Sequence, residues 1–441
     1  MNDAAEAREK QELASELAAW HRDARRRSLD LVAGLGDEQL LGPRLPIVNP
    51  LRWEIGHVGW FQEFWALRQA RGEKPIRADA DSLYDSIRIP HDTRWDLPLP
   101  SMEETCAYIE AVLERVLERL ACREPTASEV YFHRLAIFHE DMHDEAFTYT
   151  RQTLGYPKLS FCAFEPKAAV SAGPLPGDIE VPGGRFLLGA TKDIPFVFDN
   201  EKWAHPVEVA PFSIARAPVT NVEYAAFVQS GGYRRQDLWC AEGWAWRESI
   251  AAEHPVYWRR SSGGDWERRR FDCWGPLEPY HPVIHVNWFE ADAYCRWAGR
   301  RLPTEAEWEM AASAEPVSGG GIGTRKRRYP WGAEPPEPNR ANLDGRLGCL
   351  DVGALPAGDS AFGCRQMLGN VWEWTATNFG PYPGFVPDPY KEYSQPWFGD
   401  HMILRGGCWV TRGRLLRNTW RNFYKPDRRD VFAGFRTCAA R

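Results

Sequence analysis

The sequence predicts a helical bundle followed by a mixed α/β domain. The chain has 441 residues, more than one hydrophobic core usually supports. Its first third carries apolar residues at three- and four-residue spacing, as amphipathic helices do. Later, short apolar segments alternate with Gly, Pro, Asn and Asp, which is typical of a loop-rich mixed domain. We therefore expect a bundle over 1–164, a linker over 165–178 and a second domain over 179–441.

Composition excludes several classes of protein. The net charge of −7 argues against binding to nucleic acid or an anionic membrane. The sequence lacks the apolar run of a signal peptide or a membrane span, so we expect a cytoplasmic protein with no membrane contact. Ten cysteines without a C-x-x-C pair disfavour disulfides and zinc ribbons.

Four segments of the bundle have helical periodicity. They are Glu12–Val32, His57–Arg71, Met102–Leu120 and Ser128–Leu154. Short breaks between them indicate an antiparallel bundle, in which ligand sites are built from inward-facing side chains.

The second domain follows the sequence EPKAAVSAGPLPGD, whose Pro, Ala and Gly are typical of a linker. We expect only two or so clear helices in this domain, near Asn221–Gln229 and Trp288–Ala298. The glycine-rich segment 318–328 predicts a flexible surface loop, including the basic run Arg325–Arg328, and lacks the context of a phosphate-binding loop.

A metal site is predicted on the last bundle helix. His139 and His143 are four residues apart, so both imidazoles lie on one helix face. The same run, HEDMH, matches the zinc-protease pattern in which Glu140 would be the general base. His57, on an earlier helix among aromatic residues, is a credible third ligand. Three neutral nitrogens leave open positions for oxygen and substrates on iron, or for a thiolate on zinc. The remaining histidines, such as His21, His133, His281 and His285, are expected to be structural.

Longer motifs carry a family resemblance across nearly the whole chain. They are PIVNPLRWEIGHVGWFQEFWALR, LYDSIRIP, HRLAIFHEDMHDE, LGNVWEWTATNFGPYPGF, YKEYSQPWFGD, LRGGCW and RNFYKPDRRDVFAGFR. The chain resembles the iron-dependent sulfoxide synthases of ergothioneine and ovothiol biosynthesis and the related selenoneine synthases. This resemblance implies a DinB-like metal-binding bundle and a second domain like formylglycine-generating enzymes, with a C-type-lectin-like fold.

The resemblance also implies the chemistry. Iron(II), held by His57, His139 and His143, would take up O2, hercynine and a sulfur or selenium donor between the two domains. The chalcogen would be joined oxidatively to the hercynine imidazole. Tyr382 is the candidate proton donor. The alternative is a turn tyrosine packed against Trp372 or Trp374.

Departures from the family pattern concern the substrates. Two arginines that bind donor carboxylates in relatives using gamma-glutamylcysteine correspond here to His91 and Arg94. The Trp-Asp pair of those relatives corresponds to Phe423 and Tyr424, after Asn422. Losing these charges favours a neutral donor such as a selenosugar, because aromatic rings stack on sugar faces.

Hercynine recognition must also differ. Two glutamines that hold hercynine in those relatives correspond to Phe61 and Met142. An aromatic cage of Trp60, Phe61 and Tyr382 is available for the trimethylammonium group, while Met142 suits soft packing beside the metal. We therefore favour a selenoneine synthase over an ergothioneine-type enzyme that uses cysteine or gamma-glutamylcysteine.

Three other functions remain open from the sequence. A three-histidine site in a bundle also suits a zinc-dependent thiol transferase or hydrolase. The second domain could generate formylglycine, although Cys408 and Cys438 do not form that family's close pair. A lectin-like binding module would leave the bundle as a scaffold.

Overall fold

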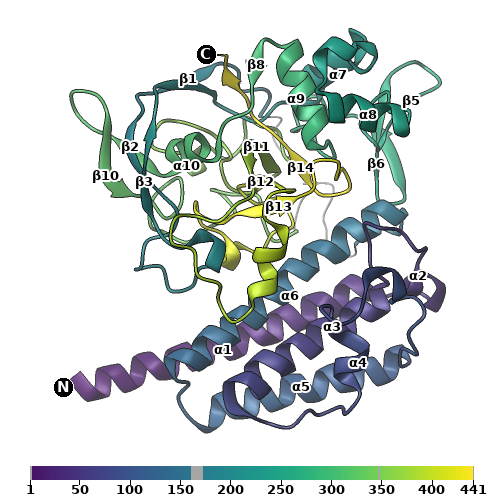
Figure 1. Ribbon diagram of the computed structural model, residues 1–441, viewed down its shortest axis with the longest axis vertical. Helices are drawn as coiled ribbons and strands as arrows, with labels where there is room; N and C mark the ends of the chain where they lie inside the picture. Colours follow the sequence, from purple (N-terminus) through teal and green to yellow (C-terminus); the bar gives the residue numbers. More distant parts are fainter. Residues whose placement is uncertain (1, 160–171, 346–347, 441) are drawn as a thin grey trace. The chain divides into compact units, whose positions relative to one another are not determined.

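The chain folds into two compact units, Met1–Tyr156 and Pro157–Arg441. The computed structural model in Figure 1 describes residues 2–159, 172–345 and 348–440. Of the linker expected at 165–178, residues 165–171 lie outside the described residues. The end of that segment belongs to the second unit, because the backbone of Gly173 bonds with Asp351 and Gly353 at 2.9 and 3.1 Å. Among the described residues, no helix is long and apolar enough to cross a membrane.

The first unit is the predicted helix bundle. Its long helices are α1 (Asn2–Val32), α3 (Leu51–Gln62), α5 (Met102–Cys122) and α6 (Ala127–Leu154), and α3 continues as a π-helix over Glu63–Gln69. Shorter helices are α2 (Asp37–Leu41), α4 (Ala80–Tyr84) and a 3-10 turn at His91–Thr93. Both α1 and α3 pack against α5 and α6, as Figure 1 shows.

Capping residues explain where the predicted helices begin. Ser101 and Thr126 each accept a hydrogen bond from the backbone three residues later, forming capping boxes with Glu104 and Glu129. Gly155 closes α6 in the left-handed region, with φ of 65°. The prediction for α3 began too late, at His57, because the buried Glu54 interrupts the apolar pattern of its first turn.

The described residues of the second unit form several small sheets, four α-helices and short 3-10 turns. Two four-stranded sheets have the orders β1-β4-β15-β8 and β13-β12-β11-β14, and smaller ones are β2-β3, β9-β10 and β5-β6-β7. The strands are β1 (Asp178–Val181), β2 (Gly184–Leu188), β3 (His205–Val209), β4 (Phe212–Ala215), β5 (Trp258–Arg260), β6 (Trp266–Arg270), β7 (Cys273–Pro276), β8 (Arg300–Arg301), β9 (Ala314–Pro316), β10 (Ile322–Lys326), β11 (Trp372–Asn378), β12 (Met402–Arg405), β13 (Asn422–Tyr424), β14 (Ala433–Gly434) and β15 (Cys438–Ala439). The helices are α7 (Asn221–Gln229), α8 (Ala241–Ser249), α9 (Trp288–Trp297) and α10 (Glu305–Ser313).

Two expectations for this unit were wrong. Helices α8 and α10 were missed. The acids Glu305, Glu307 and Glu309 give the sequence of α10 a polar pattern, although all three side chains are buried in the structure. The segment 318–328 is not simply a loop, since it contains β10, which pairs with β9 just before it in the chain. Lys326 of β10 forms an ion pair with Glu309 and is largely buried, so the basic run is only partly solvated.

Candidate metal centre

The three predicted ligands converge in the bundle. His57 comes from α3, and His139 and His143 come from α6, which packs against α3. One nitrogen of each imidazole lies within 4.8 Å of the other two. His57 and His139 are buried, and His143 is half-buried. This arrangement is close enough for all three side chains to share one ion.

Hydrogen bonds fix two of the rings. Nδ1 of His57 donates to the carbonyl oxygen of Tyr84 at 2.8 Å, which leaves the Nε2 lone pair for a metal. Nδ1 of His143 lies 2.6 Å from Oε1 of Glu54. This contact likewise leaves Nε2 of His143 for a metal. Tyr84 and Glu54 are therefore the groups that orient these rings.

The electrostatics suit a cation. Burial lowers the pKa of His57 well below its ordinary value, and His143 lowers it further. The pKa of His139 is lowered for the same reasons, burial first. Both rings are thus neutral near pH 7, the form that binds metals. The carboxylate of Glu54 is buried beside them, and three imidazoles fit a divalent transition metal such as iron or zinc.

Aromatic residues pack directly on the ligands. Phe61 stacks on His139 with ring centroids 3.5 Å apart, and Trp53 stacks on His57 at 4.7 Å. Trp60 stacks near His57 at 5.8 Å, and its indole N–H donates to Asp81 at 2.8 Å. Phe61 thus supports a ligand ring, and its use in a cage for trimethylammonium stays a prediction, as does any role of Met142 on α6.

The two predicted carboxylate-binding positions differ in their surroundings. His91 is bound through Nε2 to the carbonyl oxygen of Val48 at 2.7 Å. The guanidinium of Arg94 lies over the ring of Trp53 at 3.9 Å and donates to Asn49 at 2.6 Å. Trp53 therefore contacts both Arg94 and the ligand His57, and the charge of Arg94 contributes to the lowered pKa of His57. Arg94 is therefore the better placed of the two to act near the metal.

Glu140 does not occupy the position of a protease base. Its carboxylate is buried, lies 2.8 Å from Nε of Arg25, and accepts from the hydroxyl of Ser28 at 3.0 Å. Both partners belong to α1, so the carboxylate is engaged between α1 and α6. The H-E-x-x-H spacing is thus used for a structural ion pair, which removes the basis for the protease interpretation.

Tyr382 lies in the second unit and is buried. Its hydroxyl donates to Oε1 of Glu305 at 3.1 Å, and the guanidinium of Arg421 lies 4.1 Å from its ring centroid. His205 packs on the ring at 4.6 Å. Burial raises the pKa of Tyr382 well above its ordinary value, so the phenol keeps its proton. Glu305, Arg421 and His205 hold this residue, where the alternative interpretation named Trp372 and Trp374.

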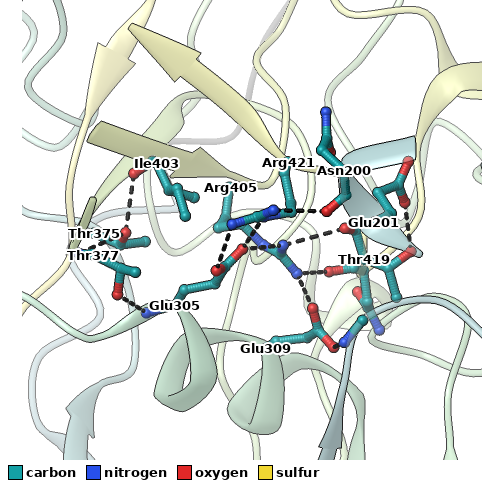
Figure 2. A network of polar contacts seen from close by, with 12 residues as sticks. Asn200, Glu201, Glu305, Glu309, Thr375, Thr377, Ile403, Arg405, Thr419 and Arg421 are labelled. Carbon is teal, nitrogen blue, oxygen red and sulfur yellow. Dashed lines mark hydrogen bonds and ion pairs between the residues drawn. The ribbon is translucent and has the colours of Figure 1, made fainter. Parts of the chain in front are cut away.

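The acceptor of the tyrosine proton is itself held by ion pairs. Figure 2 shows the carboxylate of Glu305 on α10 in contact with both Arg405 and Arg421, whose nitrogens lie 3.0 and 2.8 Å from its Oε1. Arg405 also contacts Glu309, so two acids and two arginines form one buried network. Such a network fixes the hydroxyl of Tyr382 in one place.

The candidate donor residues lie on β13, where alternate side chains point to opposite faces. Phe423 stacks on Phe379 with ring centroids 3.9 Å apart. Tyr424 lies beneath the guanidinium of Arg428 at 5.1 Å. Asn422 shares the face of Tyr424. Phe423 and Tyr424 therefore cannot both face one donor molecule, a constraint that the sequence did not reveal.

Sequence reasoning missed Glu54 and Arg25. A signal for Glu54 was present, because an acid inside the apolar segment PLRWEIGH, three residues before a ligand, is costly to bury without a partner. Arg25 gave no comparable signal among the neighbouring arginines.

Comparisons with known proteins agree with this architecture. The DinB superfamily model matches residues 21–146, and the sulfatase-modifying factor enzyme 1-like domain matches residues 164–441. The chain is 41% identical to the hercynine oxygenase of Mycolicibacterium thermoresistibile, over 96% of this chain and 94% of the relative. It is 40% identical to the hercynine oxygenase of Mycobacterium tuberculosis, over 96% and 98%. The formylglycine-generating enzyme of Streptomyces coelicolor is 33% identical over 64% of this chain and 96% of the relative.

Both domains and nearly the full length are thus shared with the first two relatives, whereas the third matches the second domain. The chain therefore belongs to the hercynine oxygenase family, the sulfoxide synthases of the ergothioneine type, and is an oxidoreductase.

Proposed function

We propose that this enzyme uses iron(II) and O2 to join a chalcogen donor to the imidazole of hercynine, and that the donor is a selenosugar. The observation that carries the proposal is the convergence of three histidines in a chain similar to hercynine oxygenases. In the coupling a C–H and an Se–H bond break and a C–Se bond forms, and O2 takes up the two protons and two electrons released, which brings it to the oxidation level of hydrogen peroxide.

Each named residue has a part in this proposal. His57, His139 and His143 hold the iron, which supplies reactivity toward O2 and open positions for substrates. Tyr382 holds a proton at its hydroxyl and delivers it to reduced oxygen, while Glu305 keeps that hydroxyl in place. Arg94, Trp60 and Met142 would contact the substrates beside the ligands.

The choice of donor rests on charge. Phe423 and Tyr424 replace the Trp-Asp pair whose acid, in relatives that use gamma-glutamylcysteine, meets the donor's amino group. A neutral sugar needs no such partner, and an unpaired ammonium group would lose affinity here. The second candidate is an ergothioneine-type enzyme that forms a C–S bond with cysteine or gamma-glutamylcysteine.

A competition experiment tests both steps. The protein is loaded with iron(II) without oxygen and then exposed to air with hercynine and equal amounts of selenosugar, gamma-glutamylcysteine and cysteine, and the products are identified by mass. We expect selenium transfer with little thiol product. Preference for a thiol would move the enzyme to the second candidate, and no oxygen use with any donor would overturn the proposal.

Two controls separate the remaining alternatives. His139→Ala should abolish turnover, whereas a lectin-like module would keep its ligand binding. Loading with zinc in place of iron should give no product, whereas a zinc-dependent transferase would be active. Formylglycine generation has little support, because burial raises the pKa of the Cys438 thiol to about 12.

A further inference from the structure

We infer that Glu54 is a positioning residue of the metal site: its carboxylate fixes the ring of His143 and supplies the buried negative charge that strengthens metal binding. The inference rests on the proposed function, because it assumes that the three histidines hold a metal. It concerns a residue that touches a ligand and not the metal itself.

Glu54 lies on α3 within reach of two of the metal ligands. It precedes His57 by three residues on α3, so the two side chains share one helix face. From there Oε1 reaches across to Nδ1 of His143 on α6 at 2.6 Å, joining residues 89 positions apart. Helix α3 therefore provides one ligand and also orients a ligand from another helix.

The second oxygen of the Glu54 carboxylate, Oε2, favours a cation nearby. Glu54 is only 1% exposed, and Oε2 has no hydrogen-bond partner among the described residues. A buried carboxylate with an unsatisfied oxygen is unfavourable unless a positive charge lies nearby. A divalent ion bound by the three imidazoles would supply such a charge. The carboxylate thus favours the metal-loaded site over the metal-free one.

The two oriented ligands differ in a way that makes this testable. His57 is oriented by the neutral carbonyl of Tyr84, and His143 by a carboxylate. The carbonyl of Tyr84 belongs to the backbone and cannot be removed by substitution, whereas the side chain of Glu54 can. Glu54→Gln keeps an oxygen that accepts from His143 but removes the charge, Glu54→Asp keeps the charge but shortens the reach, and Glu54→Ala removes both.

The measurement is metal affinity, which needs no turnover. Full-length protein is freed of metal and titrated without oxygen with Fe(II), and separately with Co(II), against a competing chelator, while the visible spectrum of Co(II) reports ligand geometry. We expect one ion per wild-type chain. Loss of such a partner typically weakens metal binding about 10- to 100-fold, so Glu54→Gln should fall in that range with a nearly unchanged spectrum. Glu54→Ala should bind more weakly still, with an altered spectrum.

Glu63→Gln is the matched control. Glu63 is also a buried carboxylate on the continuation of α3, but it accepts from Tyr108 and from the backbone of Ile76 at 2.5 Å. Its substitution should leave metal affinity unchanged, and circular dichroism checks that all variants are folded. Wild-type affinity in Glu54→Gln and Glu54→Ala would overturn the inference alone. Failure of the wild-type protein to bind either ion would overturn the proposed metal site together with it.

Discussion

Arg25 and Glu140 form a buried ion pair, 2.8 Å from nitrogen to oxygen, that links α1 to the helix carrying two metal ligands. The same guanidinium donates to the carbonyl oxygen of Ile109 on α5 at 2.5 Å and to Gln62 on α3 at 2.9 Å. One side chain therefore connects all four long helices. Glu140 adjoins the ligand His139, so the pair sets the position of α6 at the metal site.

Removing one partner of this pair should destabilise the bundle strongly. Arg25→Met leaves the buried carboxylate of Glu140 without its cation, and such changes cost about 3–5 kcal/mol. Urea unfolding followed by circular dichroism measures the loss. Arg44→Met is the control, because Arg44 and Asp96 form an exposed pair, for which a change of at most about 1 kcal/mol is expected. Equal effects of the two substitutions would contradict the role of Arg25.

Tyr382→Phe should lower turnover about 10²- to 10⁴-fold if its hydroxyl delivers a proton. The fold should persist, because Glu305 keeps its ion pairs with Arg405 and Arg421. Metal affinity should not change. Tyr393 is another tyrosine of the same unit, whose hydroxyl accepts from the indole N–H of Trp420 at 3.5 Å, and Tyr393→Phe should leave turnover nearly unchanged. Normal product formation by Tyr382→Phe would exclude the proton-donor role.

The buried His285 should make the second unit less stable in acid. Burial lowers its pKa to about 3 from 6.5, with Arg268 adding to the effect. Between these values the unfolded imidazole binds a proton that the folded one does not, so the free energy of unfolding falls as pH falls. The loss from this group between pH 7 and pH 5 is about 2 kcal/mol.

The comparison is between the wild-type protein and His285→Asn, because asparagine tolerates the left-handed backbone of this position, φ 63°. Hydrogen exchange of the segment around residue 285 at both pH values gives local stability. The wild-type protein should lose more protection than the variant as pH falls. A pH effect of the same size in both would assign it to other groups.

Donor preference should depend on Tyr424 more than on Phe423. The face of Phe423 is occupied by Phe379, so Phe423→Leu should reduce stability with little change in preference. Tyr424→Asp restores a carboxylate that could pair with an amino group, and it should shift kcat/KM from the selenosugar toward gamma-glutamylcysteine. The ratio of the two kcat/KM values is the measurement. A larger shift with Phe423→Leu would place the donor on the other face of β13.

Local sequence signals were enough for α5 and α6 of the bundle. Capping boxes at Ser101 and Thr126 and the apolar spacing of three and four residues determined where α5 and α6 begin, because helices depend on neighbouring residues. The four-residue spacing of His139 and His143 determined that they share a face. The second domain was less predictable, since α10 carries buried acids whose partners are remote in the chain.

The sequence by itself therefore determined the two domains and three histidines able to meet at one ion. Only the tertiary structure decided which groups orient and support them. Glu54 and His143 are 89 residues apart, and Arg25 and Glu140 are 115 apart. Glu140 is the clearest example of a role that only the tertiary structure decided. Its position in the H-E-x-x-H pattern fitted a protease base, whereas its carboxylate pairs with Arg25. The physical reason is that burial makes a charged group depend on a specific partner, and packing brings that partner from a distant part of the chain.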